Sequence, residues 1–196
     1  MSRKRDKPDH ELVEAFQAGD PKAFDGLVVR HQDMVFNLCY RMLGDYDDAD
    51  DCAQETFVRV YRSLKGFKFK SAFSTWLYRV TVNTCKNRIA SAGYRRERET
   101  VRINGWADPE SDARPLEIRD CTYAPNGAFE RREREEEVQR AMDTLPDDQR
   151  LVVVLRDIEG LSYEEISVIS GLKLGTVKSN IARARRRLRE KLKGLI

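Results

Sequence analysis

The sequence predicts an all-α protein made of two small helical domains that a flexible linker joins. Apolar residues recur three and four positions apart from about residue 11 to 91, and again from about 131 to 196. Between these stretches, residues 92–130 carry three prolines, scattered charge and no sustained apolar period. A chain of 196 residues has room for two domains of this size. Residues 1–10 are expected to form an N-terminal tail.

Charge is unevenly distributed, although the net charge is only +3. Residues 45–55 hold six acids and no base, whereas the last twenty-one residues hold eight bases and one acid. A chain with one acidic and one basic surface is expected to have two partners of opposite charge. The longest aliphatic run, Leu151–Leu155, is too short to span a bilayer. We therefore expect a soluble, cytoplasmic protein without membrane insertion, monomeric on its own.

The cysteines give no sign of a metal or redox site. They form no CxxC pair and have no histidine at metal-ligand spacing. We expect reduced, mostly buried thiols, no metal ion and no cofactor. A redox or zinc role of the cysteines is the alternative that stays open, and Cys121 in the linker could be a redox group. The four positions are Cys39, Cys52, Cys85 and Cys121.

Within the first domain, the segment Asp48–Arg62 predicts an amphipathic helix. Its apolar stripe consists of Ala49, Ala53, Phe57, Val60 and Leu64, and acids occupy the opposite side. An exposed helix held by i,i+4 ion pairs would account for the charges. A protein-docking surface would also account for the crowding of acids in the first turns. Both interpretations stay open on the residues alone.

The next segment combines a basic and aromatic loop with a second helix. The loop Lys65–Phe73 alternates phenylalanines with lysines, a pattern that suits single-stranded or melted DNA, whose bases stack on rings. The alternative is that Phe67 and Phe69 are ordinary core residues. In the helix that follows, the predicted core stripe is Phe73, Trp76, Leu77, Val80 and Thr84, and polar residues including Arg79, Asn83 and Lys86 lie on other faces.

In the second domain, the positions of the helix-capping and turn residues predict a helix-turn-helix. Ser162 and Glu165 predict a capping box, Gly171 predicts a helix end, and Thr176 is the expected N-cap of the second helix. The stripe of that helix faces a core, and basic residues occupy the far side, as in a helix that lies in the major groove. A solvated face, or one that lies on a membrane surface, is the alternative. The predicted stripe is Val177, Ile181, Ala184, Leu188, Leu192 and Leu195.

Two blocks of sequence carry a family resemblance. "DADDCAQETFVRVYRSLKGFKFKSAFSTWLYRVTVNTCKNRI" resembles region 2 of the extracytoplasmic-function (ECF, group 4) subfamily of bacterial sigma-70 factors. "LPDDQRLVVVLRDIEGLSYEEISVISGLKLGTVKSNIARARRRLREKL" is similar to region 4 of the same family. Together the blocks cover the two predicted domains, 11–91 and 131–196, in the family order. Regions 1.1 and 3 have no counterpart, which is typical of this short subfamily.

The resemblance implies an alternative sigma factor that binds core RNA polymerase and directs it to promoter DNA. Its implied partners are the clamp helices of the largest polymerase subunit, the polymerase flap, promoter DNA and an anti-sigma factor. No catalytic or metal site is implied, because catalysis belongs to the polymerase. The implied core-binding residues are Asp48, Asp51, Gln54, Glu55, Arg59 and Arg62.

The resemblance also implies two DNA sites, one for each promoter element. The residues that would recognise and melt the minus-ten element are Lys65, Phe67, Lys68, Phe69, Lys70, Ser71, Phe73, Arg79, Asn83, Lys86 and Asn87. The residues that would read the minus-thirty-five element are Thr176, Lys178, Ser179, Asn180, Ala182, Arg183, Arg186 and Arg187. The chain departs from the family pattern at Asn180, at Ala182 and in "FKFKSAF", so the promoter preferences of relatives do not transfer.

Two rival functions remain for comparison. A stand-alone helix-turn-helix regulator would need the second domain, but neither the acidic helix nor the aromatic loop. A nucleic-acid enzyme would need catalytic groups, and the sequence has no HxE with CxxC and no Gly-rich phosphate loop. The four aspartates 47, 48, 50 and 51 fan around a helix axis and do not converge on a Mg²⁺ ion.

Overall fold

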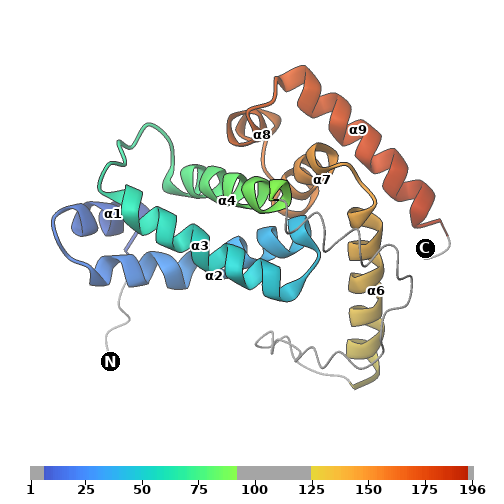
Figure 1. Ribbon diagram of the computed structural model, residues 1–196, viewed down its shortest axis with the longest axis horizontal. Helices are drawn as coiled ribbons and strands as arrows, with labels where there is room; N and C mark the ends of the chain where they lie inside the picture. The colour runs from blue at the N-terminus through green and yellow to red at the C-terminus, as the bar shows by residue number, and fades with distance from the viewer. Residues whose placement is uncertain (1–6, 92–124, 194–196) are drawn as a thin grey trace.

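A computed structural model describes residues 7–91 and 125–193, and all regular secondary structure in these ranges is helical (Figure 1). The predicted all-α class is therefore confirmed. The N-terminal lobe consists of α1 (Asp9–Gln17), α2 (Lys22–Leu43), α3 (Tyr46–Leu64) and α4 (Phe73–Ala90). The C-terminal lobe consists of α6 (Pro125–Asp143), α7 (Asp147–Val153), a π-helical turn η1 (Val154–Ile158), α8 (Tyr163–Ser170) and α9 (Leu174–Lys191).

Helices α2, α3 and α4 pack side by side and form the centre of the N-terminal lobe (Figure 1). Gly44, in the left-handed region at φ 79°, ends α2, and the Asp45 side chain accepts the Asp48 N–H at 2.9 Å to begin α3. The predicted apolar stripe of α3 faces the core: four of its five members are buried, and Phe57 is half-buried. Local sequence signals therefore place this helix correctly.

Helix α4 is buried on more sides than the single predicted stripe. Phe73, Leu77 and Thr84 of that stripe are buried, and so are Tyr78 and Cys85, which the periodicity did not assign to the core. The reason is that α4 packs against α8 of the other lobe as well as against α2 and α3. Its polar face is correspondingly narrow.

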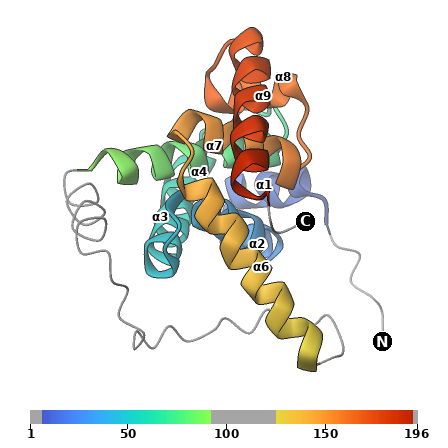
Figure 2. The same ribbon diagram turned by 90° about the vertical axis from the view of Figure 1, so that its right-hand side faces the viewer.

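The two lobes contact each other across a shared apolar core. Leu77 of α4 and Leu155 and Ile166 of the C-terminal lobe belong to one cluster of buried side chains. In Figure 2, α7, α8 and α9 lie above the N-terminal lobe, and α6 runs diagonally downward in front of it. Helix α6 begins at Pro125, inside the segment 92–130 that was predicted as a linker. Cys121 lies outside the described residues.

Polar contacts reinforce the junction of the lobes. The Arg150 side chain, 2% exposed, donates to the carbonyl oxygen of Met42 at 2.6 Å and to that of Met142 at 3.1 Å. The Tyr78 hydroxyl donates to the Glu159 carboxylate at 2.6 Å. Buried polar groups with partners of this kind fix the orientation of the lobes, since separating them would leave the groups unpaired.

The helix-turn-helix of the C-terminal lobe is confirmed, with one correction. The predicted capping box of Ser162 and Glu165 is present, and Gly171 ends α8 at φ 75°. The prediction that Thr176 caps the second helix is wrong, because α9 begins at Leu174 with Lys173 as its N-cap residue. The Ser167 hydroxyl donates to the carbonyl of Leu172 at 2.7 Å within the turn, and the N-cap lies three residues earlier than expected.

Candidate nucleic-acid interface

The acidic face of α3 is exposed. Both interpretations of this helix, a solvated face held by i,i+4 ion pairs and a protein-docking surface, require this exposure. The Asp51 side chain is 67% exposed and that of Glu55 49%, and Gln54 is exposed beside them. Glu55 forms an i,i+4 ion pair with Arg59 at 2.6 Å. Such exposed pairs contribute only about 0.3–0.5 kcal/mol to stability. The face therefore remains accessible to a partner, and Arg62 is exposed on the same helix.

Asp48 differs from the other acids of this face because it is held by α4. Its carboxylate accepts two hydrogen bonds from the Arg88 guanidinium, and Asp51 lies 3.6 Å from the same group. The bonds to Asp48 raise the pKa of Arg88. Arg88 was not among the predicted site residues. This ion pair fixes the N-terminal half of α3 relative to α4. The predicted polymerase-docking face on α3 and the predicted minus-ten surface on α4 are therefore held in a fixed relative position.

The loop between α3 and α4 presents aromatic rings and lysines together. Phe67 is half-buried, and its ring centroid lies 5.0 Å from that of Phe69 and 5.1 Å from that of Trp76. Phe69 is 43% exposed and has φ 53°, a left-handed conformation that is uncommon for a residue with a large side chain. Phe73 is buried at 5% exposure. The exposed polar residues of the loop are Lys65, Lys68, Lys70 and Ser71.

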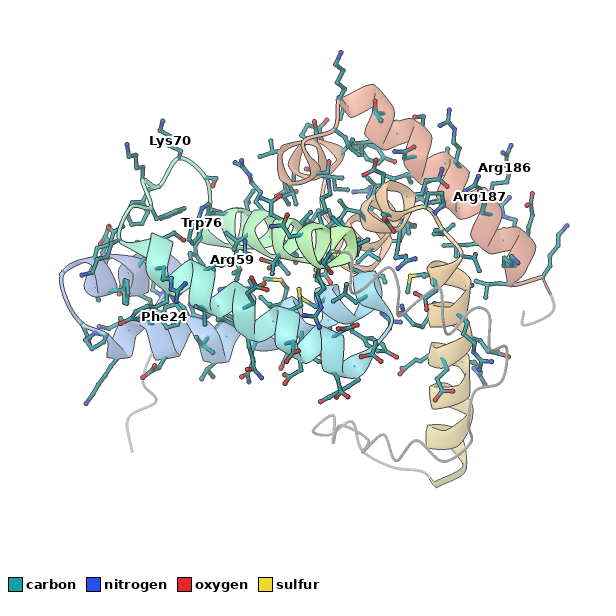
Figure 3. All side chains as sticks on the ribbon, in the orientation of Figure 1. Phe24, Arg59, Lys70, Trp76, Arg186 and Arg187 are labelled. Atoms are coloured by element: carbon teal, nitrogen blue, oxygen red, sulfur yellow. The ribbon has the colours of Figure 1, made fainter. Side chains whose placement is uncertain are left out.

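Sequence reasoning missed two residues that shape this loop. The Gln17 side-chain amide, from α1, donates to the carbonyl oxygens of Leu64 and Phe67 at 3.0 and 2.9 Å. Trp76 was assigned to the core stripe but is only half-buried, and it lies near the start of α4 below Lys70 at the loop tip (Figure 3). No local pattern could have revealed Gln17, because its partners lie 47 and 50 residues away.

On α4, which follows this loop, Arg79, Asn83 and Asn87 are exposed. Lys86 is half-buried and turned toward the C-terminal lobe, where its ammonium lies 3.4 Å from the carbonyl oxygen of Ser170 and 4.0 Å from the Asp148 carboxylate. The packing of the lobes therefore engages one member of the predicted minus-ten set and leaves the other three polar residues of the helix accessible.

Helix α9 presents a basic outer face (Figure 3). Two residues of the predicted minus-thirty-five set are not fully exposed on this face. Asn180 is buried at 8% exposure. Ser179 is half-buried, and its hydroxyl donates to the carbonyl of Thr176 at 3.0 Å. Arg185, which was not predicted, is tied to Asp157, and this bond raises its pKa. The exposed members of the predicted set are Thr176, Lys178, Ala182, Arg183, Arg186 and Arg187.

The start of the helix-turn-helix is held by polar contacts. The Ser162 backbone N–H donates to the Glu165 carboxylate at 2.8 Å, which lowers the pKa of Glu165. The Tyr163 ring packs under the Arg156 guanidinium at 4.8 Å and lies 5.9 Å from the Lys178 ammonium. These contacts fix α8 against the beginning of α9, so the exposed bases are presented on a rigid support.

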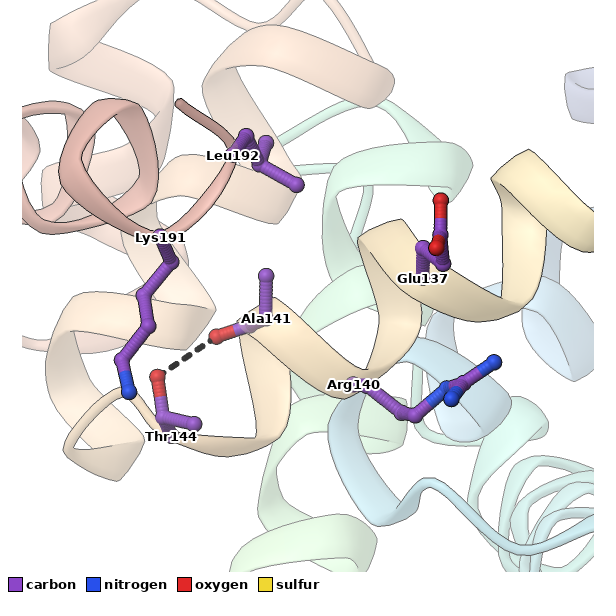
Figure 4. A pocket seen from close by; sticks show the side chains of 6 residues that line it. All are labelled: Glu137, Arg140, Ala141, Thr144, Lys191 and Leu192. Carbon is purple, nitrogen blue, oxygen red and sulfur yellow. Dashed lines mark hydrogen bonds between the residues drawn. The ribbon is translucent and has the colours of Figure 1, made fainter. Parts of the chain in front are cut away.

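A hollow of about 290 Å³ lies between α6 and the end of α9 (Figure 4). It is lined by Glu137, Arg140, Ala141, Thr144, Lys191 and Leu192. The Thr144 hydroxyl donates to the Ala141 carbonyl at 2.8 Å, and the charged side chains do not converge on a point (Figure 4). Among the six lining residues, Glu137 is the single carboxylate, so the hollow holds no pair of acids for acid–base chemistry. In residues 7–91 and 125–193, no helix is both long and apolar enough to cross a bilayer.

Comparison with known proteins matches both lobes to one family. The family model for sigma-70 region 2 matches residues 27–95, and that for sigma-70 region 4 matches residues 135–188. The RNA polymerase sigma-H factor of Pseudomonas aeruginosa is 39% identical over 188 residues, which are 96% of this chain and 95% of the relative. The ECF RNA polymerase sigma-E factor of Escherichia coli (strain K12) is 40% identical over 188 residues, 96% of each chain.

Two solved structures share the arrangement of the helices. CnrH, in complex with the cytosolic domain of CnrY, matches with a TM-score of 0.65 at 25% identity and covers 94% of this chain and 97% of that chain. The sigma factor RpoE from Bartonella quintana, in complex with the anti-sigma factor NepR, matches with a TM-score of 0.62 at 24% identity, over 88% of this chain and 98% of that chain. The second similarity concerns the fold.

Proposed function

The chain belongs to the sigma-70 family of RNA polymerase sigma factors, in the ECF subfamily, and from this premise we propose how its surfaces divide the steps of transcription initiation. It is an alternative sigma factor that directs initiation by RNA polymerase. In the proposed division, residues 11–91 act as region 2, residues 131–196 act as region 4, and 92–130 tether them. The protein works in the cytoplasm and carries no catalytic site of its own.

The exposed acidic face of α3 docks on core RNA polymerase. The centre of this face consists of Asp51, Gln54 and Glu55. Arg59 and Arg62 lie toward the C-terminal end of α3. Asp48 supports this face through Arg88 and contacts the polymerase only at its edge. The observation that carries the proposal is the exposure of acids beyond what the helix N-terminus requires, opposite a stripe of which four of five members are buried. A stand-alone regulator would have no use for this surface.

The loop between α3 and α4 captures the minus-ten element. Phe69 and Trp76 offer partly exposed rings on which an unpaired base can stack, and Lys68 and Lys70 hold the phosphates beside them. Phe67 and Phe73 support these rings from below. Arg79, Asn83 and Asn87 extend the surface along α4. Lys86 joins them once the C-terminal lobe moves away and its Ser170 carbonyl no longer contacts the Lys86 ammonium.

The outer face of α9 reads the minus-thirty-five element in duplex DNA. Lys178, in the first turns of the helix, and Arg183, near its middle, reach base edges, whereas Arg186 and Arg187 hold phosphates. Asn180, being buried, supports the helix and is not proposed as a base contact.

An anti-sigma factor is the proposed regulator. CnrH, whose structure was solved with the cytosolic domain of CnrY, matches 94% of this chain, so both lobes take part in the similarity. The packed arrangement of the lobes here would be stabilised by a partner that contacts both of them, and Lys86 would stay engaged with the C-terminal lobe.

Binding to core polymerase tests the docking role. Full-length protein with Asp51→Ala and Glu55→Ala is expected to bind sigma-free core at least about tenfold more weakly, because charged groups at an interface steer and hold the partner. The matched control is Asp33→Ala with Asp25→Ala, which removes two exposed acids from α2. Equal losses in the two double variants, or no loss in either, would remove the docking role from α3.

A further inference from the structure

Three cysteine side chains converge inside the N-terminal lobe. Cys39 comes from α2, Cys52 from α3 and Cys85 from α4, and their exposed fractions are 0%, 3% and 0%. The Cys85 sulfur lies 3.7 Å from the sulfur of Cys52 and 3.7 Å from that of Cys39, and all three sulfurs are within 4.8 Å of one another. All three thiols are free. We name this group the thiol cluster.

The dimensions of the thiol cluster match those of a metal site. A triangle with two sides of 3.7 Å and a third no longer than 4.8 Å has its centre about 2.4 Å or less from each corner, against a typical metal–thiolate bond of about 2.3 Å. An ion at the centre would therefore bond all three sulfurs with shifts of a few tenths of an ångström. From this geometry we infer that the thiol cluster binds one soft, thiophilic cation of the Cu⁺ class.

The choice of cation follows from the ligands. All three donors are sulfur, and thiolates select soft cations such as Cu⁺ and Zn²⁺ over Mg²⁺ or Ca²⁺. Across residues 7–91 and 125–193, no histidine or carboxylate joins the cluster as a fourth donor. Structural Zn²⁺ takes four ligands, whereas Cu⁺ is stable with three sulfurs in a plane. Each thiol that ionises on binding releases its proton to solvent.

The position of the thiol cluster gives the bound cation a structural consequence. It lies where α2, α3 and α4 meet, so metal bonds would tie the polymerase-docking helix α3 to α4, which carries the proposed minus-ten residues. Because the sulfurs are inaccessible in the closed fold, the ion must enter during folding or when the helices transiently separate. Close packing of three thiols as small apolar groups is the competing explanation.

Copper binding to the purified, full-length protein tests the inference without polymerase or DNA. The parent carries Cys121→Ser, so that only the three clustered thiols remain. Under anaerobic, reducing conditions, Cu⁺ is delivered as a complex with a coloured chelator whose loss of absorbance reports transfer. We expect one Cu⁺ per chain, a higher midpoint of thermal unfolding, and a copper X-ray absorption spectrum with sulfur alone in the first shell.

Two variants in the same background distinguish a metal site from packing. Cys85→Ala removes the sulfur that the other two share, and Cys39→Val keeps the apolar volume in case the first variant is poorly folded. Each is expected to lose at least about tenfold in Cu⁺ affinity and the thermal shift, because two sulfurs bind a soft cation less tightly than three. Unchanged transfer in both variants, no transfer to the folded parent, or tighter binding of Zn²⁺ than of Cu⁺ would overturn the inference.

Discussion

The hydrogen bond between Tyr78 and Glu159 should contribute measurably to the stability of the whole protein. Tyr78→Phe removes one hydroxyl and leaves the ring, which is 8% exposed, in place. The hydroxyl donates to a carboxylate at 2.6 Å, and hydrogen bonds to charged groups contribute about 1.5–3 kcal/mol. Because Glu159 is only half-buried, its carboxylate regains water in the variant. The expected loss is therefore about 1.5 kcal/mol, near the lower end of that range.

Urea unfolding followed by helical circular dichroism measures this loss. The shared core of the two lobes predicts that the variant unfolds in one transition, at a lower urea concentration than the wild type. The control is Tyr61→Phe, whose side chain is 48% exposed on α3, and its free energy of unfolding should change by less than about 0.5 kcal/mol. If both variants are as stable as the wild type, the lobes are not held together by this contact, and the reasoning fails.

Three further variants test the remaining surfaces. Arg183→Ala should cost about 1–3 kcal/mol on the cognate minus-thirty-five duplex and relax its sequence preference, whereas a uniform loss on all duplexes would make Arg183 a phosphate contact. Phe67→Ala should slow promoter opening more than closed-complex binding, because the rings of Phe69 and Trp76 rest against it; unchanged permanganate reactivity of the melted bases would refute this. Ser162→Ala should destabilise the protein by about 1 kcal/mol in urea unfolding through loss of the capping box, and Ser179→Ala, outside any cap, should cost less.

Features that depend on neighbours in the sequence could be predicted. The capping box joins Ser162 to a residue three positions away, and the stripe of α3 follows from helical spacing alone. The start of α9 was misplaced by three residues because Thr176, judged from its local sequence alone, has a hydroxyl that could cap a helix. The hydrogen bond from Ser167 to the carbonyl of Leu172, five residues on, lies within the turn and has no periodic pattern in the sequence that would predict it.

Features that depend on distant partners could not be predicted. Arg150 is buried because it donates to the carbonyl of Met42, 108 residues away, and nothing in "DDQRLVVVL" indicates this. The sulfurs of the thiol cluster are brought together across 33 and 46 residues, so their spacing in the sequence predicted no metal site. The engagement of Lys86 likewise depends on how the lobes pack.

The most direct test of the central claim is transcription by sigma-free bacterial core RNA polymerase to which the full-length protein is added. The template is a pool of random promoters, and the start sites are sequenced. An alternative sigma factor predicts new start sites that share one pair of promoter elements, and their loss in the variant with Asp51→Ala and Glu55→Ala. Duplex binding without affinity for core from the source organism, and without new start sites, would contradict the account.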